Sequence, residues 1–229
     1  TGLVEGNGMN TSRHSVSALS ERSGYVQQDP EAQLFCASVE DEIAFPLENR
    51  GIAPDIIDKQ IDVMLDLVGM TGYRKRVPAS LSGGQMQRVA IAAALAAEPD
   101  VLILDEPTAA LDPEGKQEVF DVLERIRQTR SMTVIMAEQD TEHIAYWADQ
   151  VLFMVNGELV RNGDASLFVR EKGLLESSGV QVADDPLPQV KAVQQGKKHK
   201  KDKKNQPERS KDVVISLDHV SYQYERGGN

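Results

Sequence analysis

Apolar residues recur at helical or strand spacing along most of the chain. Residues 55–68 carry a helical stripe of apolar positions, and residues 85–97 form an alanine-rich run with good helix propensity. Residues 114–129 predict a third helix. The short apolar runs at 101–104 and 133–137 predict strands that are covered on both faces. Because helices alternate with strands, the sequence predicts an α/β fold built on a parallel sheet.

A different pattern begins near residue 150. Asn156 and Gly157 stand between alternating apolar residues, which predicts a β-hairpin over residues 150–163. A small antiparallel hairpin should therefore follow the parallel core.

Polar residues dominate the stretch 191–211, which contains no apolar run and cannot pack into a core. We expect a flexible, solvated tether, with a contact to a membrane surface as the alternative role of its lysines. These are Lys197, Lys198, Lys200, Lys201, Lys203 and Lys204. Beyond them, residues 213–217 and 220–224 predict strands with nothing following to pair them, which resembles the start of another domain.

Composition narrows the class of protein. With 229 residues, of which 40% are hydrophobic, the chain can bury a sizeable core. Its net charge of -11 argues against a nucleic-acid binder, because phosphate backbones are bound by excess Lys and Arg. Cys36 is the only cysteine, so no intrachain disulfide can form and a reducing compartment fits. The longest apolar stretch, 89–97, is about half of the roughly 20 residues that a membrane-spanning helix needs.

Two adjacent acids follow the predicted strand at 101–104. Asp105 and Glu106 should emerge at its carboxyl end, where open α/β sheets bind ligands. Mg²⁺ prefers carboxylate and water oxygens and usually arrives with substrate phosphates. We therefore expect Asp105 to hold the water shell of the metal, and Glu106 to orient or deprotonate an attacking water. The alternative is a solvated strand end with two ordinary acids.

A glycine-rich loop, Leu-Ser-Gly-Gly-Gln at 81–85, precedes the alanine-rich helix. Glycines let the backbone approach a ligand, and the free N–H groups of a helix N-terminus favour an anion. The hydroxyl of Ser82 adds a donor, so a phosphate is the expected occupant. Taken alone, the loop would be a serine N-cap with a glycine-rich turn. Only one helix and one strand separate it from Asp105, and this combination favours the phosphate site.

Together these features resemble the ATP-binding cassette (ABC) family, in which Leu-Ser-Gly-Gly-Gln is the signature loop and the strand ending in Asp-Glu is the Walker B strand. Gln28 matches the Q-loop glutamine that contacts the metal, with Gln27 as the one-residue alternative. Asp112, in Ala-Leu-Asp at 110–112, matches the D-loop that communicates across the dimer. Residues of about 39–80 correspond to the helical subdomain that docks on a membrane subunit.

Residues 38–49 resemble the energy-coupling-factor branch, which imports vitamins and transition metals. The resemblance implies a P-loop-type cassette with ATP and Mg²⁺ as cofactors. It also implies integral membrane transporter subunits as partners, and a peripheral place on the cytoplasmic face of the cell membrane. Nucleic acid is not an expected partner.

Two departures from the family pattern stand out. The P-loop, G-x-x-x-x-G-K-[ST], holds the phosphates in this family, and no such string occurs in the sequence. Because residues 1–10 resemble the hairpin that follows the P-loop helix, we expect a truncated N-terminus. Gln139 stands where family members carry the switch histidine, and glutamine can donate to a γ-phosphate but cannot become an imidazolium. His143, one turn further on, is the alternative.

Residues 214–224 resemble the opening strand of a second cassette. Tyr224 matches the aromatic residue that stacks on adenine, the alternative being an ordinary strand aromatic. The expected domains are a truncated cassette at 1–172, a lysine-rich linker at 173–211 and the start of a second cassette at 212–229.

Cassettes of this family pair head to tail, so the resemblance assigns the chain to two nucleotide sites. One site, whose P-loop is missing here, contains Gln28, Asp105, Glu106 and Gln139. The site of the neighbouring cassette is completed by Ser82, Gly83, Gly84 and Gln85. The implied function is an ATP-binding and ATP-hydrolysing subunit that powers a membrane importer, inactive as this fragment alone. The alternatives are a soluble ABC ATPase acting on ribosomes or DNA, and a nucleotide-independent interaction module.

Overall fold

The computed structural model describes residues 3–6, 9–139, 141–180, 182 and 215–218. They fall into two compact units. One unit is His14–Glu138, and the other combines Thr1–Arg13 with Gln139–Asn229. The lysine-rich stretch 191–211 and Tyr224 lie outside the described residues.

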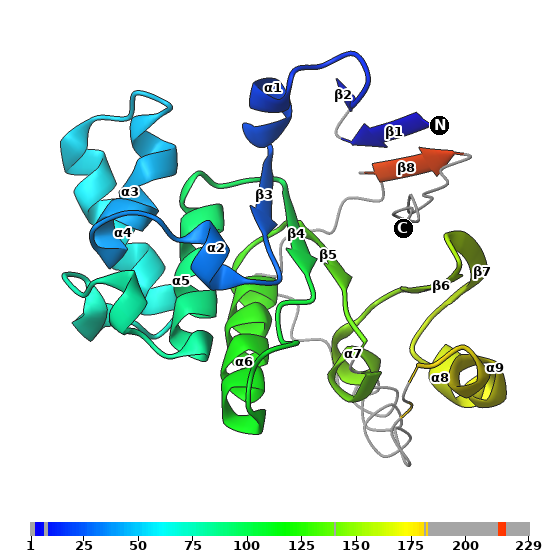
Figure 1. The fold of residues 1–229 in the computed structure, drawn as a ribbon. Coiled ribbons are helices and arrows are strands. Elements are labelled where there is room, and N and C mark those ends of the chain that lie inside the picture. Colours follow the sequence, from blue (N-terminus) through cyan, green and yellow to red (C-terminus); the bar gives the residue numbers. More distant parts are fainter. Residues whose placement is uncertain (1–2, 7–8, 140, 181, 183–214, 219–229) are drawn as a thin grey trace, which may run out of the picture. The chain divides into compact units, whose positions relative to one another are not determined.

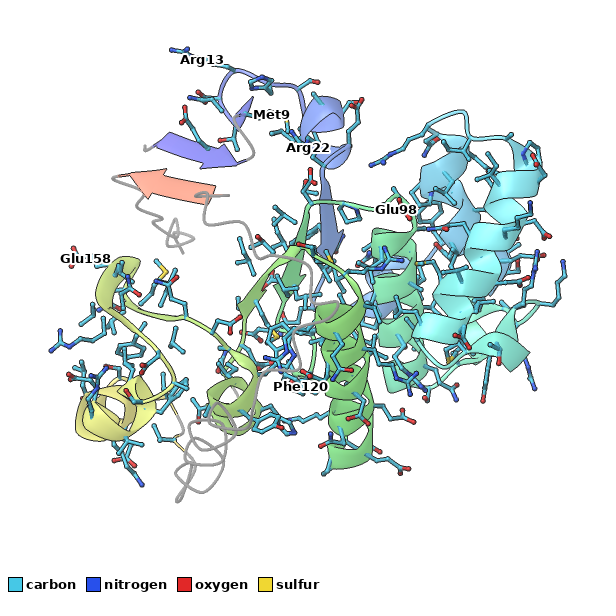
Figure 2. The ribbon with its side chains drawn as sticks, turned by 180° about the vertical axis from the view of Figure 1, so that it is seen from behind. Met9, Arg13, Arg22, Glu98, Phe120 and Glu158 are labelled. Carbon is cyan, nitrogen blue, oxygen red and sulfur yellow. The ribbon has the colours of Figure 1, made fainter. Side chains whose placement is uncertain are left out.

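A parallel sheet of three strands runs through the unit His14–Glu138 (Figure 1). Its order is β3 (Ser23–Val26), β4 (Val101–Asp105) and β5 (Thr133–Ala137). Arg22, labelled in Figure 2, precedes β3 and forms an ion pair of 2.6 Å with Asp100, which precedes β4. The predicted parallel sheet is confirmed, and helices supply the crossover connections that parallel strands require.

The two faces of this sheet are unequally covered. On one face Val26 and Leu102 are fully buried. On the other face lie the cross-strand neighbours Tyr25, Ile103 and Ile135, and Tyr25 is 49% and Ile135 38% exposed. The prediction that β5 is covered on both faces was therefore wrong. An apolar run identifies a strand, but it does not show whether a second layer packs on it.

Helix α5 (Gly83–Ala96) packs against β3 and against α6 (Pro113–Thr129). A Cβ on Gly24 of β3 would lie 2.6 Å from the carbonyl oxygen of Ala94, so only glycine lets the α5 backbone approach the strand this closely. The other side of α5 packs on α3 (Val39–Glu48) and α4 (Pro54–Leu67) (Figure 1). The three helices expected from periodicity are confirmed, each within two residues at either end.

The stretch 39–80 is helical in its regular elements. Besides α3 and α4 it contains the 3₁₀ helices η1 (Thr71–Tyr73) and η2 (Pro78–Ser80), and α1 (Val16–Ser20) and α2 (Pro30–Gln33) precede it. Arg74 joins these elements by donating to Glu40 at 2.7 Å, to Asp62 at 2.8 Å and to Asp58. Hydrogen bonds from Arg74 and Lys75 lower the pKa of Glu40. One arginine thus links α3, α4 and the turn that follows them.

Cys36 lies in the turn between α2 and α3, and its N–H donates to the carboxylate of the buried Glu42. Burial of the thiol, followed by the negative charge of Glu42, raises the pKa of Cys36 to about 11. Because the thiolate is the reactive form, we expect slow alkylation by iodoacetamide at pH 8, with roughly a hundredfold less thiolate than an unperturbed thiol has. The rate should still rise with pH above 9.

This prediction has a matched pair of variants. Glu42→Gln removes the closer charge and should speed the alkylation of Cys36 at pH 8, whereas Glu48→Gln removes a weaker influence and should change the rate little. Mass spectrometry of the single cysteine gives both rates. Equal rates in the two variants would contradict a contribution of Glu42 to the raised pKa of Cys36.

The second unit contains the predicted hairpin. Strands β6 (Val151–Val155) and β7 (Glu158–Gly163) pair antiparallel across Asn156 and Gly157. Both turn residues have positive φ, 50° and 82°, as the two-residue type I′ turn requires. Helices α7 (Thr141–Trp147), α8 (Leu167–Arg170) and α9 (Lys172–Ser177) complete this part of the unit. Their core consists of Ala145, Phe153, Leu167, Phe168 and Leu175.

Two features near the end of the chain were not predicted from the sequence. The linker was expected to begin at residue 173, but Leu175 of α9 is buried in the core just described. No later segment was expected to pair with the strand predicted at 213–217, and β8 (Ile215–Asp218) pairs antiparallel with the much earlier β1 (Leu3–Gly6), which also pairs with β2 (Met9–Asn10). No helix in the described part of the chain is both long and apolar enough to cross a membrane.

Candidate functional site

The two predicted acids stand at the carboxyl end of β4. Asp105 is the last residue of the strand and is exposed. Glu106 follows with φ of 42°, a left-handed conformation that costs a non-glycine residue about 1–2 kcal/mol. Its N–H donates to the carbonyl oxygen of Ala137 in β5 at 2.8 Å. The neighbouring strand thus holds Glu106 in a strained backbone, which is common at functional sites.

Each acid also accepts a hydrogen bond from the β3 side of the sheet. The hydroxyl of Tyr25 donates to Asp105 Oδ2 at 3.0 Å, and Gln28 Nε2 donates to Glu106 Oε2 at 2.7 Å. The bond to Asp105, followed by burial, raises the pKa of Tyr25. Residues far apart in the sequence meet here because β3 lies beside β4.

The structure brings Gln28, of the two glutamines that the sequence left open, to the acids. The N–H of Gln27 donates to Gln33 Oε1 at 2.8 Å, and Gln33 Nε2 donates to the Tyr25 carbonyl oxygen at 3.2 Å. Asp29 then caps α2. These bonds connect the Q-loop, residues 26–29, to α2, and Gln28 lies beside Glu106.

Ser82 and Gln85 form a capping box at the start of α5. Ser82 Oγ accepts from the Gln85 N–H at 3.3 Å, and Gln85 Oε1 accepts from the Ser82 N–H at 3.1 Å. The serine N-cap considered from sequence is therefore present. Gly83 is exposed whereas Gly84 is buried, so Ser82 and Gly83 are the residues that face solvent at this end of the helix dipole. An anion at this end would meet Ser82 and Gly83 first.

Side-chain hydrogen bonds of Thr108 and Asp112 fix the segment between β4 and α6. Thr108, fully buried, donates to Glu138 Oε2 at 2.6 Å. Asp112 caps α6, since its Oδ1 accepts from the Gly115 N–H at 2.8 Å. A cavity of about 180 Å³ lies among the Q-loop, the first turn of α5 and this segment; its lining includes Gln28, Gly83, Pro107 and Leu111. Three loops singled out in the sequence thus line one cavity.

The other predicted site residues belong to the second unit or lie outside the described part of the chain. Gln139 and His143 belong to the second unit, where Gln139 is exposed and His143 is half-buried in α7. Tyr224 is not among the described residues. Their roles stay predictions.

Sequence reasoning missed Tyr25 and did not assign a role to Thr108. A tyrosine in a short strand just before Gln28 is a weak signal, because nothing local says which strand lies beside it. Only the register, with Tyr25 opposite Ile103, brings its hydroxyl within reach of Asp105. Thr108 becomes visible as a structural tie only through its contact with Glu138, 30 residues away.

The donors at the strand end suit Mg²⁺. Asp105 offers an exposed carboxylate, and the bond from Gln28 Nε2 to Glu106 leaves the side-chain oxygen of Gln28 as a second hard donor. Within the described ranges, no group of three or more His, Cys, Asp or Glu residues could hold a metal ion by itself. Mg²⁺ commonly takes its other oxygens from phosphates and water.

The fold and this site define the class of α/β nucleotide-binding domains. A family model described as ABC transporter matches residues 1–109. The structure of CbiO1 from Clostridium perfringens, described as part of the ABC transporter complex CbiONQ, aligns with a TM-score of 0.67 and 33% identity over 82% of this chain and 74% of that chain. The chain belongs to the ABC transporter ATP-binding family. The family and the fold class predicted from the sequence are confirmed.

Relatives point to one branch of the family. The energy-coupling factor transporter ATP-binding protein EcfA1 of Streptococcus agalactiae is 43% identical over 159 residues, which are 69% of this chain and 57% of the relative. EcfA2 of Enterococcus faecalis is 42% identical over 154 residues, 67% of this chain and 53% of the relative. The chain spans less than two thirds of the length of the curated relatives it matches.

Proposed function

We propose that this chain is part of the ATP-binding and ATP-hydrolysing subunit of a membrane importer of the energy-coupling-factor type, which takes up a vitamin or a transition metal. The observation that carries the proposal is Glu106, strained at φ 42° beside Asp105 and bonded to Gln28 at 2.7 Å. The names of the two EcfA relatives support the importer branch.

In this proposal Asp105 and Gln28 hold Mg²⁺, which when bound neutralises charge on the nucleotide phosphates. Glu106 accepts a proton from the attacking water, and the hydrogen bond from Gln28 keeps its carboxylate oriented. Gln139 donates a hydrogen bond to the γ-phosphate in place of the switch histidine.

The signature loop serves a different nucleotide, that of a neighbouring cassette in the same chain or in a homologous subunit. Ser82 and Gly83 are exposed at the start of α5 and meet its phosphates, while Gly84, Gln85 and the D-loop residue Asp112 support them. Residues 212–229 open the second cassette, with Tyr224 stacking on adenine.

The helical subdomain, about 39–80, docks on the integral membrane subunits at the cytoplasmic face of the membrane. Phe35 lies just before this subdomain and Phe45 lies within it, in α3; they are 69% and 42% exposed, and their rings pack edge to face with centroids 5.0 Å apart. Aromatic residues are enriched at protein interfaces, so this pair suits a buried contact with a partner.

The test uses the intact protein as its gene encodes it. We expect Mg²⁺-dependent ATP turnover that a chelator abolishes, co-purification with integral membrane proteins, and no turnover above background by the 229-residue chain alone. Co-purification with ribosomes or DNA instead would favour the soluble ABC ATPase. Turnover by the 229-residue chain that Glu106→Gln removes would contradict the prediction that this chain alone is inactive.

A further inference from the structure

The first turns of α5 and α6 touch through two glycines. A Cβ on Gly84 would lie 3.3 Å from the Cα of Gly115, and a Cβ on Gly115 would lie 3.8 Å from the Cα of Gly84. No side chain separates the two helix backbones at this point. The contact joins the end of α5 that carries the signature loop (residues 81–85) to the end of α6 that carries the D-loop (residues 110–112).

Gly115 is in addition held against the residue that caps its own helix. Its N–H donates to Asp112 Oδ1 at 2.8 Å, and a Cβ on Gly115 would lie only 2.9 Å from that same oxygen. The φ of Gly115 is not in the left-handed region, so its backbone alone would accept any residue. Packing against Asp112 and Gly84 is therefore what requires glycine here.

Two further contacts brace the same pair of segments. On the loop side, a Cβ on Gly83 would lie 3.5 Å from Leu111 Cδ2. One turn into the helices, Arg88 Nη2 lies 3.1 Å from Glu118 Oε2, and the side chain of Arg88 is only 12% exposed. Three contacts therefore join the start of α5 to the segment that contains the D-loop and the start of α6: Gly83 with Leu111, Gly84 with Gly115, and Arg88 with Glu118.

We infer that Gly115 is a positioning residue, which by its contact with Gly84 and Asp112 holds the signature loop and the D-loop as one rigid unit. The inference rests on the proposed function in one respect, that both loops face the nucleotide site between paired cassettes. Donors aimed at phosphates lose much of their effect when displaced by about 1 Å. A wedge between α5 and α6 should therefore weaken catalysis without touching a residue that contacts the nucleotide.

Helix propensity and the proposed packing role predict opposite effects of replacing Gly115 by alanine. Alanine is a better helix former than glycine, so Gly115→Ala would by propensity alone stabilise α6. In the intact protein we expect it instead to lower ATP turnover by at least about tenfold, with the ATP affinity of a single cassette changed less than about twofold. Gly72→Ala is the control, because a Cβ on Gly72 meets nothing within 4 Å; it should change neither quantity.

A second readout needs no nucleotide. Amide hydrogen exchange of the nucleotide-free intact protein should become about tenfold faster in Gly115→Ala for peptides that cover 81–87 and 110–116, whereas α4 and the remaining parts of α5 and α6 should be unchanged. Glu118→Gln removes the ion pair with Arg88 without adding volume, and it should speed exchange in the same peptides by about threefold. This second variant keeps the test open if Gly115→Ala does not fold.

The outcomes separate the two claims. Unchanged exchange at the two loops in both variants overturns the positioning role, even if turnover falls. Faster exchange throughout α4, α5 and α6 also overturns it, since that would be general destabilisation. An unmodified intact protein that binds no ATP overturns the proposed function alone, because the exchange comparison does not depend on nucleotide.

Discussion

Glu106→Gln in the intact protein is expected to slow ATP hydrolysis by about 10²–10³-fold and to leave ATP binding unchanged. Glu106 directly follows Asp105, the proposed metal ligand, and its carboxylate accepts a hydrogen bond of 2.7 Å from Gln28. A glutamine side chain has the same shape and can still accept the bond from Gln28, but it cannot take a proton from water. The chemistry should therefore fail while the geometry stays.

Single-turnover hydrolysis and equilibrium ATP binding measure the two halves of this prediction separately. Glu114→Gln is the matched control, because Glu114 is an exposed acid in the first turn of α6; it should leave both rate and affinity unchanged. A Glu106→Gln variant that loses ATP affinity would show that the carboxylate binds the nucleotide or its metal, and the role of general base would fall.

Ile91→Ala is expected to destabilise the unit His14–Glu138 by about 2–5 kcal/mol. Ile91 lies in α5 and is fully buried, and α5 packs on α3, α4, α6 and β3. Removing the side chain loses buried apolar surface and leaves a cavity that these elements cannot all close around. A buried isoleucine of α5 should therefore contribute far more to the free energy of unfolding than an exposed isoleucine on the surface of the unit.

The same substitution at an exposed helical position provides the comparison. Ile56 in α4 is 55% exposed, and Ile56→Ala should change the free energy of unfolding by less than about 1 kcal/mol, since alanine also has the better helix propensity. Denaturant unfolding followed by circular dichroism measures both variants. Similar midpoints for the two would mean that α5 does not form the core of the unit.

Local periodicity was enough to place the main elements. The stripe at 55–68 and the run at 85–97 became α4 and α5, and the Asn156-Gly157 turn became the β6–β7 hairpin. These features depend on side-chain spacing over one or two turns, which is written in neighbouring residues. The coverage of β5 and the partner of β8 depend on distant segments, and the local pattern did not reveal them.

The sequence by itself determined that two acids end a buried strand, that a serine and glycines open a helix, and which family carries both. Only the tertiary structure decided that Tyr25 and Gln28 bond to Asp105 and Glu106, and that Gly84 is buried against Gly115 rather than exposed beside Gly83. The physical reason is that strand register and helix crossing set these neighbours. Both arise from hydrogen bonding and packing between segments far apart in the chain, which no local pattern of residues encodes.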